Sequence, residues 1–357
     1  MEKIRIVIAD DSSLARGLLR NFLENEADIE VVGEARNGRQ AVELACELKP
    51  DLITMDLEMP VLSGLEAIKE IMCNKAIPIL VVSSVADAHN ALEAIGNGAL
   101  EVVSKPDYTP EQAADFVAKV RMLSGVSVIT RLRPRKAFAP IAAMPTSAIR
   151  PATPMPLTQV GTAYTRIFAI ASSTGGPQAL AQILPALPAN FPCPVLIAQH
   201  ISDGFACGMT EWLSSLCKLP VRLANEGDVL QGGVIYVSPS ERHFSVTPNR
   251  RVSLLERGAM DVYRPSCDLL LRSVADVFGR QAIGIILTGM GNDGANGMAQ
   301  ILAKGGTTLG QDETTSIIYG MNRVAIEAGS VQRTLAAESI AAEMVRLADP
   351  FLFGAAP

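Results

Sequence analysis

The sequence predicts an α/β protein with two domains, each a parallel sheet wound by helices on both faces, joined by a proline-rich linker. Three observations predict this class. The chain of 357 residues has about the length of two ordinary domains. Short apolar runs alternate with amphipathic stretches over residues 3–123 and again over 166–348. Between them, the segment 125–165 contains six prolines and no clear apolar period, which is typical of a linker.

In the first domain, 1–124, four β-rich apolar runs predict buried strands, and each run stops on a polar residue. The runs are IRIVIADD, DLITMD, ILVVSS and EVVSKP. Amphipathic periodicity predicts helices over 14–25 and 38–48. The polar residues at the ends of the runs are Asp10, Asp11, Asp56, Ser83 and Lys105. Functional groups gather at the carboxyl ends of parallel strands, so we expect these side chains to form one site.

The chemistry of these residues indicates an acidic, metal-binding phosphorylation site. Three carboxylates held together would repel each other and raise each other's pKa. Mg²⁺ relieves that repulsion because it prefers oxygen ligands. A carboxylate beside Mg²⁺ can attack a phosphoryl donor and become an aspartyl phosphate. Lys105 would neutralise the added charge, and the Ser83 hydroxyl would follow the phosphoryl oxygens.

The segments IVIADDS, MDLEMPVLSGLEAI, VVSS and the Lys-Pro turn resemble the receiver domain of two-component response regulators, a flavodoxin-like fold. The resemblance implies that Asp56 accepts the phosphoryl group and that Asp10, Asp11 and Asp56 bind Mg²⁺. It also implies that Ser83 and Lys105 act in the switch. One residue departs from the pattern: many receivers carry a mobile aromatic residue three positions before the lysine, where this chain has Val102. The aromatic part of the usual switch is therefore absent.

In the second domain, 166–350, the alternation returns. The predicted strands are 167–171, 195–199, 221–224, 234–237, 283–288 and 307–309. The run IFAIASSTGGPQALAQIL predicts a strand, a tight turn and a helix, because Gly175 and Gly176 let backbone N–H groups approach closely and Pro177 suits a first helical turn. A helix N-terminus favours negative charge. The runs VLIAQH and IGIILTGMGND end on His200 and Asp293.

A serine, a histidine and an aspartate at neighbouring strand ends indicate a hydrolase. The histidine would take the proton of the serine, and the aspartate would hold the histidine tautomer and stabilise the imidazolium. Taken alone, SSTGG also suits a phosphate-binding loop or a helix N-cap, and a single histidine at a strand end is more often structural. The combination favours catalysis.

Together with YRPSCDLLLRSV and SERHFSV, these motifs resemble the catalytic domain of the CheB family of chemotaxis protein-glutamate methylesterases over 166–348, and the receiver and linker precede it in the family's own order. The resemblance implies a larger, Rossmann-like second domain. It implies Ser173 as the nucleophile, His200 as the general base and Asp293 as its orienter. The backbone of Met290 would contribute to the oxyanion site.

Alternatives to these assignments remain open in the sequence. The family usually has Gly-Ala-Ser at the nucleophile, whereas this chain has Ala-Ser-Ser, so Ser172 competes with Ser173. His243, in SERHFSV, is a less favoured base. Arg264 and Ser266 would line the site or cap a helix.

The resemblance further implies a phosphorylation-activated methylesterase that removes methyl esters from glutamates of methyl-accepting chemotaxis receptors, releases methanol and also deamidates receptor glutamines. A sensor histidine kinase would be the phosphodonor. No cofactor is expected at the esterase site, and we expect a cytoplasmic monomer. Two alternatives remain. One is a response regulator whose hydrolase acts on another ester or receptor, and the other is a non-catalytic, phosphorylation-controlled binding module.

Composition excludes several classes of protein. A net charge of −6 and a pI near 5.3 argue against a nucleic-acid binder. No apolar stretch approaches the roughly 20 residues of a membrane span, and the start MEKIRIVIADD has no signal-peptide pattern. Six cysteines without CxxC spacing predict reduced, buried thiols and no zinc site. The stretch 116–202 contains no Asp or Glu, so its linker part is either a solvated tether or a clasp onto an acidic surface.

Overall fold

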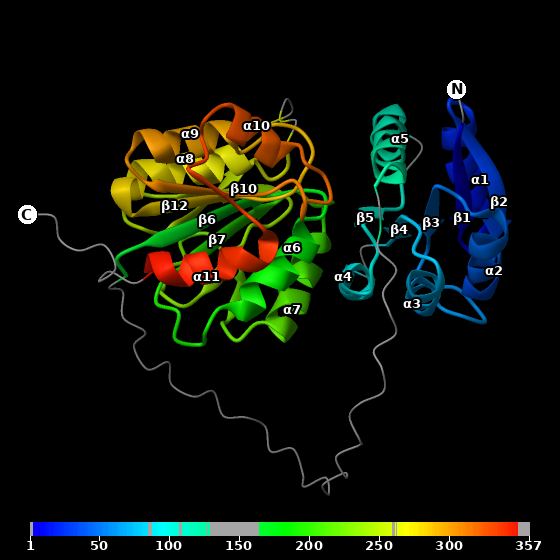
Figure 1. Cartoon of the computed structure of the whole chain (residues 1–357), viewed down its shortest axis with the longest axis horizontal. Helices are drawn as coiled ribbons and strands as arrows, with labels where there is room; N and C mark the ends of the chain where they lie inside the picture. The colour runs from blue at the N-terminus through cyan, green and yellow to red at the C-terminus, as the bar shows by residue number, and fades with distance from the viewer. Residues whose placement is uncertain are drawn as a thin grey trace, which may run out of the picture.

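The computed structural model describes residues 3–84, 88–106, 109–126, 128, 164–258, 261 and 263–348, without the side chain of residue 89. Most of the predicted linker, 125–165, lies outside these residues. Two α/β domains lie next to each other (Figure 1). The predicted fold class is therefore confirmed. No helix in these segments is both long and apolar enough to cross a membrane.

The first domain is a five-stranded parallel sheet in the order β2-β1-β3-β4-β5. Its strands are β1 (Ile4–Ala9), β2 (Ile29–Ala35), β3 (Leu52–Met55), β4 (Ile79–Ser83) and β5 (Glu101–Ser104). Its helices are α1 (Ser13–Glu24), α2 (Gly38–Leu48), α3 (Gly64–Asn74), α4 (Ala88–Gly96) and α5 (Pro110–Ser124). The strand order reverses between β1 and β3, and ligand sites in such sheets lie at this reversal.

Local sequence explains where these helices begin. The side chains of Ser12, Asn37 and Ser63 accept hydrogen bonds from the first turns of α1, α2 and α3, as N-cap residues do. Ser63 and Glu66 form a complete capping box. Strand β2 was not predicted, because it is a half-exposed edge strand whose apolar run does not stop on a polar side chain.

The second domain is a seven-stranded parallel sheet in the order β14-β13-β12-β6-β7-β9-β8. Its strands are β6 (Ile167–Ser172), β7 (Val195–Gln199), β8 (Val221–Leu223), β9 (Ile235–Val237), β12 (Ala282–Ile286), β13 (Thr307–Gln311) and β14 (Arg333–Leu335). Its helices are α6 (Gly176–Ile183), α7 (Phe205–Leu216), α8 (Cys267–Phe278), α9 (Ala295–Ala303), α10 (Met321–Glu327) and α11 (Ala337–Ala348). Helices α8 and α9 cover one face of the sheet, and α6, α7 and α11 cover the other (Figure 1).

This domain differs from the sequence-based expectation in several places. Besides one-residue differences at strand ends, β13 extends to Gln311, and β14 was not predicted. Strand β12 ends at Ile286 rather than at 288, because the Thr288 N–H leaves the ladder and donates to the Gln311 side chain at 2.9 Å. An antiparallel hairpin of β10 (Arg242–Val246) and β11 (Val252–Glu256), separate from the main sheet, was not predicted.

The two domains meet mainly where α4 packs on α7, as Figure 1 shows. Small residues allow this close approach. A Cβ atom at Gly208 would lie 2.8 Å from Ala88, closer than two such atoms can approach. The apolar packing at this face is continuous between the domains. The interface is therefore packed like a protein interior.

The cysteine prediction is correct in part. All six cysteines are free, as expected. Only Cys193 and Cys267 are buried, whereas Cys46 and Cys207 are exposed on helices α2 and α7. Cysteine composition indicates redox state but not which face of a helix a thiol occupies.

Candidate functional site

The first site lies at the strand reversal of the first domain. Asp10 follows β1 and Asp56 follows β3, and both carboxylates are buried. Lys105, which follows β5, places its Nζ 2.9 Å from Oδ2 of Asp10 and 2.9 Å from Oδ2 of Asp56. Ser83 ends β4, and its carbonyl accepts the Lys105 N–H at 3.0 Å. The structure therefore brings together the side chains of Asp10, Asp56 and Lys105, and Ser83 lies at the end of the neighbouring strand.

Burial and charge set the protonation of this site. Burial raises the pKa of the Asp56 carboxyl, and the charge of Asp10 adds to this effect against the lowering influence of Lys105. For Lys105, burial opposes the charged form, but hydrogen bonds to Asp56 and Asp10 leave its pKa above the usual value. The lysine stays charged and holds the two carboxylates together.

The donor set fits a hard divalent cation. Carboxylate oxygens of Asp10, Asp11 and Asp56 lie within 4.8 Å of one another. Such an all-oxygen set, with one exposed member, suits Mg²⁺, which retains part of its water shell. The Ser83 hydroxyl is fully buried and has no hydrogen-bond partner among the described residues.

The second site lies at the corresponding reversal of the second sheet, between β6 and β12. Ser173 follows β6 and is 9% exposed. His200 follows the neighbouring β7, and its N–H donates to the Ser172 carbonyl at 2.9 Å. His200 Nε2 lies 2.8 Å from Oδ2 of Asp293, which follows β12. The three predicted residues thus meet at one sheet edge.

The Asp293 carboxylate is held by the N-terminus of α8. It accepts hydrogen bonds from the backbone N–H of Cys267 at 2.6 Å and of Asp268 at 2.9 Å. Burial alone would raise the pKa of Asp293, but the bonds from His200 and from these two N–H groups hold it below its usual range. The carboxylate is therefore charged. Because it occupies His200 Nε2, Nδ1 remains to accept a proton.

Both candidate serines are buried, and hydrogen bonding distinguishes them. Ser172 is 0% exposed, and its hydroxyl donates to the Gln199 side chain at 2.6 Å. The Ser173 hydroxyl has no partner in the described segments, and Ser173 lines the cleft together with His200. Catalytic hydrogen bonds often form only when substrate is bound, so the missing bond between Ser173 and His200 does not count against the pair.

Backbone geometry around Ser173 requires glycine at two positions. Gly175 has φ of +77° at the start of α6, which other residues rarely adopt. Gly289 approaches so closely that a Cβ atom there would lie 2.5 Å from the Ser173 Cβ. Met290 comes next. Its backbone N–H has no partner among the described residues, and its side chain is 54% exposed.

The remaining candidates form local hydrogen bonds. His243 is buried on β10; its Nε2 bonds to Asp261 at 2.8 Å, and its Nδ1 accepts the Ser266 N–H at 2.9 Å. With both nitrogens occupied, it is not available as a base. Ser266 caps α8 and also donates to Asp293 at 3.3 Å. Arg264 is exposed and donates to the Asp261 carbonyl at 3.4 Å.

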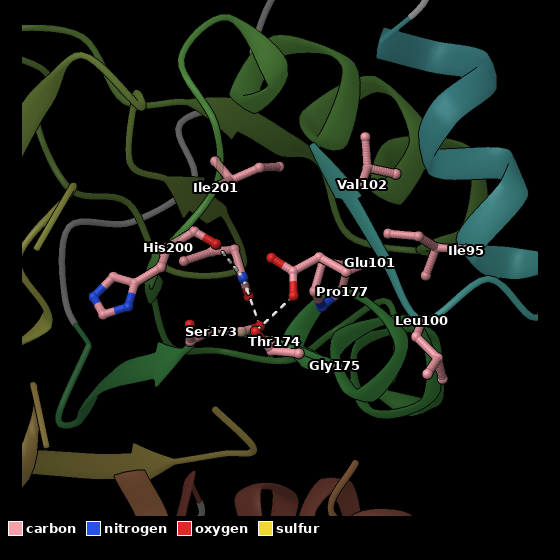
Figure 2. A pocket seen from close by; sticks show the side chains of 11 residues that line it. Ile95, Leu100, Glu101, Val102, Ser173, Thr174, Gly175, Pro177, His200 and Ile201 are labelled. Carbon is pink, nitrogen blue, oxygen red and sulfur yellow. Dashed lines mark hydrogen bonds between the residues drawn. The ribbon is translucent and has the colours of Figure 1, made fainter. Parts of the chain in front are cut away.

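The first domain covers the approach to Ser173. Figure 2 shows Glu101, from β5, reaching Thr174, where the carboxylate accepts a hydrogen bond from the hydroxyl at 2.6 Å. Gln178 on α6 donates to the Ala99 carbonyl at 2.5 Å. The apolar side chains of Ile95, Leu100 and Val102 complete the wall. The cleft has about 20 Å³ of free space, room for about one water molecule.

Sequence reasoning missed four residues at this site. They are Tyr263, stacked on His200; Cys267, whose Sγ lies 3.5 Å from His200 Nε2; and the pair Glu101 and Thr174. A signal existed for Tyr263, because it begins the motif YRPSCD in a chain with only five tyrosines. None existed for Glu101, whose partner belongs to the other domain.

Comparison with known proteins gives a consistent result. The CheB methylesterase family model matches residues 168–344, and the response regulator receiver domain model matches 6–117. The protein-glutamate methylesterase/protein-glutamine glutaminase 3 of Paramagnetospirillum magneticum is 53% identical over 99% of both chains. The corresponding Pyrococcus abyssi protein is 34% identical over 96% of this chain and 93% of its own. The Thermotoga maritima CheB methylesterase catalytic domain superimposes with a TM-score of 0.50 and 32% identity, covering 52% of this chain and all of that one.

Proposed function

The chain belongs to the CheB methylesterase family, and on that premise we propose that it is a protein-glutamate methylesterase and protein-glutamine glutaminase controlled by phosphorylation of its receiver domain. The observation that carries the proposal is the bond of 2.8 Å between His200 and a charged Asp293, beside the serine turn. Ser173, His200 and Asp293 act on γ-methyl glutamate esters in the helices of methyl-accepting chemotaxis receptors. The reaction takes place in the cytoplasm.

The geometry supports acyl transfer through a serine. The Ser173 oxygen attacks the ester carbonyl carbon as His200 takes its proton, and Asp293 stabilises the imidazolium that forms. The Met290 N–H, available next to Ser173, donates to the oxyanion. His200 then protonates the leaving methoxide, so that methanol departs. Water enters, His200 removes its proton, and the acyl-enzyme is hydrolysed to glutamate. A glutamine substrate releases ammonia by the same steps.

The receiver site supports control by phosphorylation. Asp56 is the acceptor, and Mg²⁺ would be held by Asp10, Asp11 and Asp56, where it shields the charge of the incoming phosphoryl group. Lys105 neutralises the added charge, and the buried Ser83 hydroxyl donates to a phosphoryl oxygen. A sensor histidine kinase is the donor. No step at Ser173 requires the ion.

The closed cleft supports inhibition by the unphosphorylated receiver. Only about one water molecule fits between the domains at Ser173, so a receptor helix has no access until the domains separate. Lys105, in contact with Asp56, follows the same strand, β5, that contributes Glu101 to the interface. Phosphorylation at Asp56 therefore acts on β5, the strand that contributes Glu101 to the domain interface. It shifts the population towards the form in which the domains are separated.

Replacing Glu101 with Gln is expected to raise the activity of the unphosphorylated protein. Hydrogen bonds to charged groups contribute about 1.5–3 kcal/mol, and a loss of about 1.4 kcal/mol from the closed state changes the open population tenfold. We expect basal methanol release to rise about 5- to 10-fold because the bond to Thr174 weakens. The measurement is the initial rate with receptor membranes.

The matched control for this change is Glu111→Gln. Glu111 is exposed in the first turn of α5 and has the same charge on the same domain, so its basal rate should stay at the wild-type value. Equal rates for Glu101→Gln and wild type would show that this bond does not hold the closed state.

Methanol release from methyl-esterified receptor membranes tests the proposed activity directly. The purified full-length chain, supplied with a phosphodonor and Mg²⁺, should release methanol and leave glutamate in the receptor. Hydrolysis of other esters without action on receptors would indicate a hydrolase with a different substrate. No hydrolysis of any kind would indicate a binding module.

A further inference from the structure

We propose that Tyr263 is a positioning residue of the esterase, whose ring holds the His200 imidazole while its hydroxyl holds the loop that carries Met290 and Asp293. This inference rests on the proposed function of the same site. It concerns a residue outside the Ser173, His200 and Asp293 set.

The stacking of two rings carries the first part of the inference. The Tyr263 and His200 rings lie 5.3 Å apart between centroids and are inclined by only 9°. Asp293 fixes the His200 ring at its edge through Nε2. One hydrogen bond at an edge leaves the ring free to rotate about that contact, and a flat aromatic face removes this freedom. The Asp293 hydrogen bond at the edge of the His200 ring and the stacked Tyr263 ring on its face together determine where Nδ1 lies.

The hydroxyl of Tyr263 contacts the loop on the other side of the site. It donates to the Asn292 side chain at 2.8 Å, and Asn292 immediately precedes Asp293. Gly291 lies so close that a Cβ atom there would come within 2.9 Å of the hydroxyl oxygen. Residues 291 and 292 separate Met290 from Asp293. One side chain therefore contacts both the base and the loop that carries the oxyanion donor.

The segment that carries Tyr263 is itself anchored on both sides. Before it, Asp261 bonds to His243 and accepts the Gly258 N–H at 2.6 Å. After it, the Ser266 N–H donates to the other nitrogen of His243 at 2.9 Å. A single buried histidine thus ties down both ends of a short segment. His243 therefore contacts Asp261, two residues before Tyr263, and Ser266, three residues after it.

The contribution of the ring is expected in the chemical step. His200 becomes an imidazolium in each transition state, and the face of an aromatic ring attracts a cation. Positioning and this attraction both act after the ester is bound. Loss of the ring should therefore lower kcat and leave KM almost unchanged.

The test compares three variants of the phosphorylated full-length protein in the methanol-release assay. Tyr263→Phe keeps the stacked ring and loses only the hydroxyl, so kcat should fall no more than about threefold. Asn292→Ala removes the partner of the hydroxyl and should match Tyr263→Phe. Tyr263→Leu removes the ring, and kcat should fall about 10- to 30-fold with KM within about twofold of wild type.

Ring-current shifts provide a readout that does not depend on catalysis. The His200 ring protons of the wild-type protein should be shifted upfield by the stacked Tyr263, retain that shift in Tyr263→Phe and lose it in Tyr263→Leu. Thermal unfolding of each variant shows whether the fold is retained, and Tyr263→Met replaces the leucine variant if that protein does not fold.

Three results would overturn the proposal: a leucine variant as active as wild type, an equal loss of kcat in the phenylalanine variant, or a change confined to KM, which would mean that Tyr263 binds substrate instead. An inactive wild-type protein would be a failure of the proposed function, and the ring-current comparison would still test the stacking.

Discussion

Replacing Ser173 with Ala is expected to lower methanol release by about 10⁴- to 10⁶-fold. Removal of the nucleophile from a serine, histidine and aspartate set eliminates the acyl-enzyme route and leaves only the oxyanion site and substrate binding. The residual rate should be unaffected by further replacement of His200, because both residues act in the same step. The measurement is single-turnover methanol release from methylated receptor membranes by the phosphorylated protein.

Ser172→Ala is the matched control, since it removes the same hydroxyl one residue earlier. That hydroxyl is fully buried and donates to Gln199, so its loss should lower the free energy of unfolding by about 1 kcal/mol. Activity should remain within about tenfold of wild type, because Gln199 also binds the Ser173 carbonyl and only indirectly positions the nucleophile. A larger loss of activity in Ser172→Ala than in Ser173→Ala would reverse the assignment.

Asp293→Asn should lower kcat by about 10⁴-fold with little change in fold. An amide at this position can donate to His200 Nε2, which favours the tautomer whose Nδ1 carries the proton and cannot accept one from Ser173. The two N–H groups of α8 that now bind a carboxylate would meet a neutral amide instead. The measurement is kcat over a range of pH, and the loss should persist at every pH tested.

Asp261→Asn provides a control of nearly identical geometry. Its carboxylate also lies 2.8 Å from a histidine Nε2, but that histidine is His243. We expect a loss of no more than about tenfold, through loosening of the segment that carries Tyr263. Comparable losses in both variants would mean that His243 and Asp261 belong to the catalytic apparatus.

Much of both sites could be predicted from the ends of strands. Each run of buried residues that stops on a polar side chain marks the carboxyl edge of a parallel sheet, and one edge collects all such residues. For this reason Asp10, Asp56 and Lys105 meet in one domain, and Ser173 and His200 meet in the other. The bond from the Ser172 hydroxyl to Gln199, which only the structure provides, then favours Ser173 over Ser172.

The site residues that could not be predicted lie in a loop or at the contact between the domains. Tyr263 lies between β11 and α8 and stacks on His200, and the nearby Asp261 and Ser266 both bond to the hairpin residue His243. Glu101 lies on β5 of the first domain and accepts a hydrogen bond from Thr174 of the second. Neither loop conformation nor domain contact follows from hydrophobic periodicity, because periodicity reports only which face of an element is buried.

The contact between the two domains supports our central proposal, that phosphorylation of Asp56 controls the chemistry at Ser173. The Glu101 bond joins the domains beside the narrow cleft at Ser173, and Lys105 follows the same strand and contacts Asp56. Because the interface is packed and bonded rather than loosely apposed, opening should occur between two discrete states.

The most direct test measures methanol release by the full-length protein with Mg²⁺, before and after addition of a small acyl phosphate as phosphodonor, alongside Asp56→Asn. We predict an increase of about tenfold or more in wild type and no increase in Asp56→Asn, whose basal rate stays measurable. Equal rates before and after phosphorylation of the wild-type protein, with Asp56 shown to carry the phosphoryl group, would contradict this proposal.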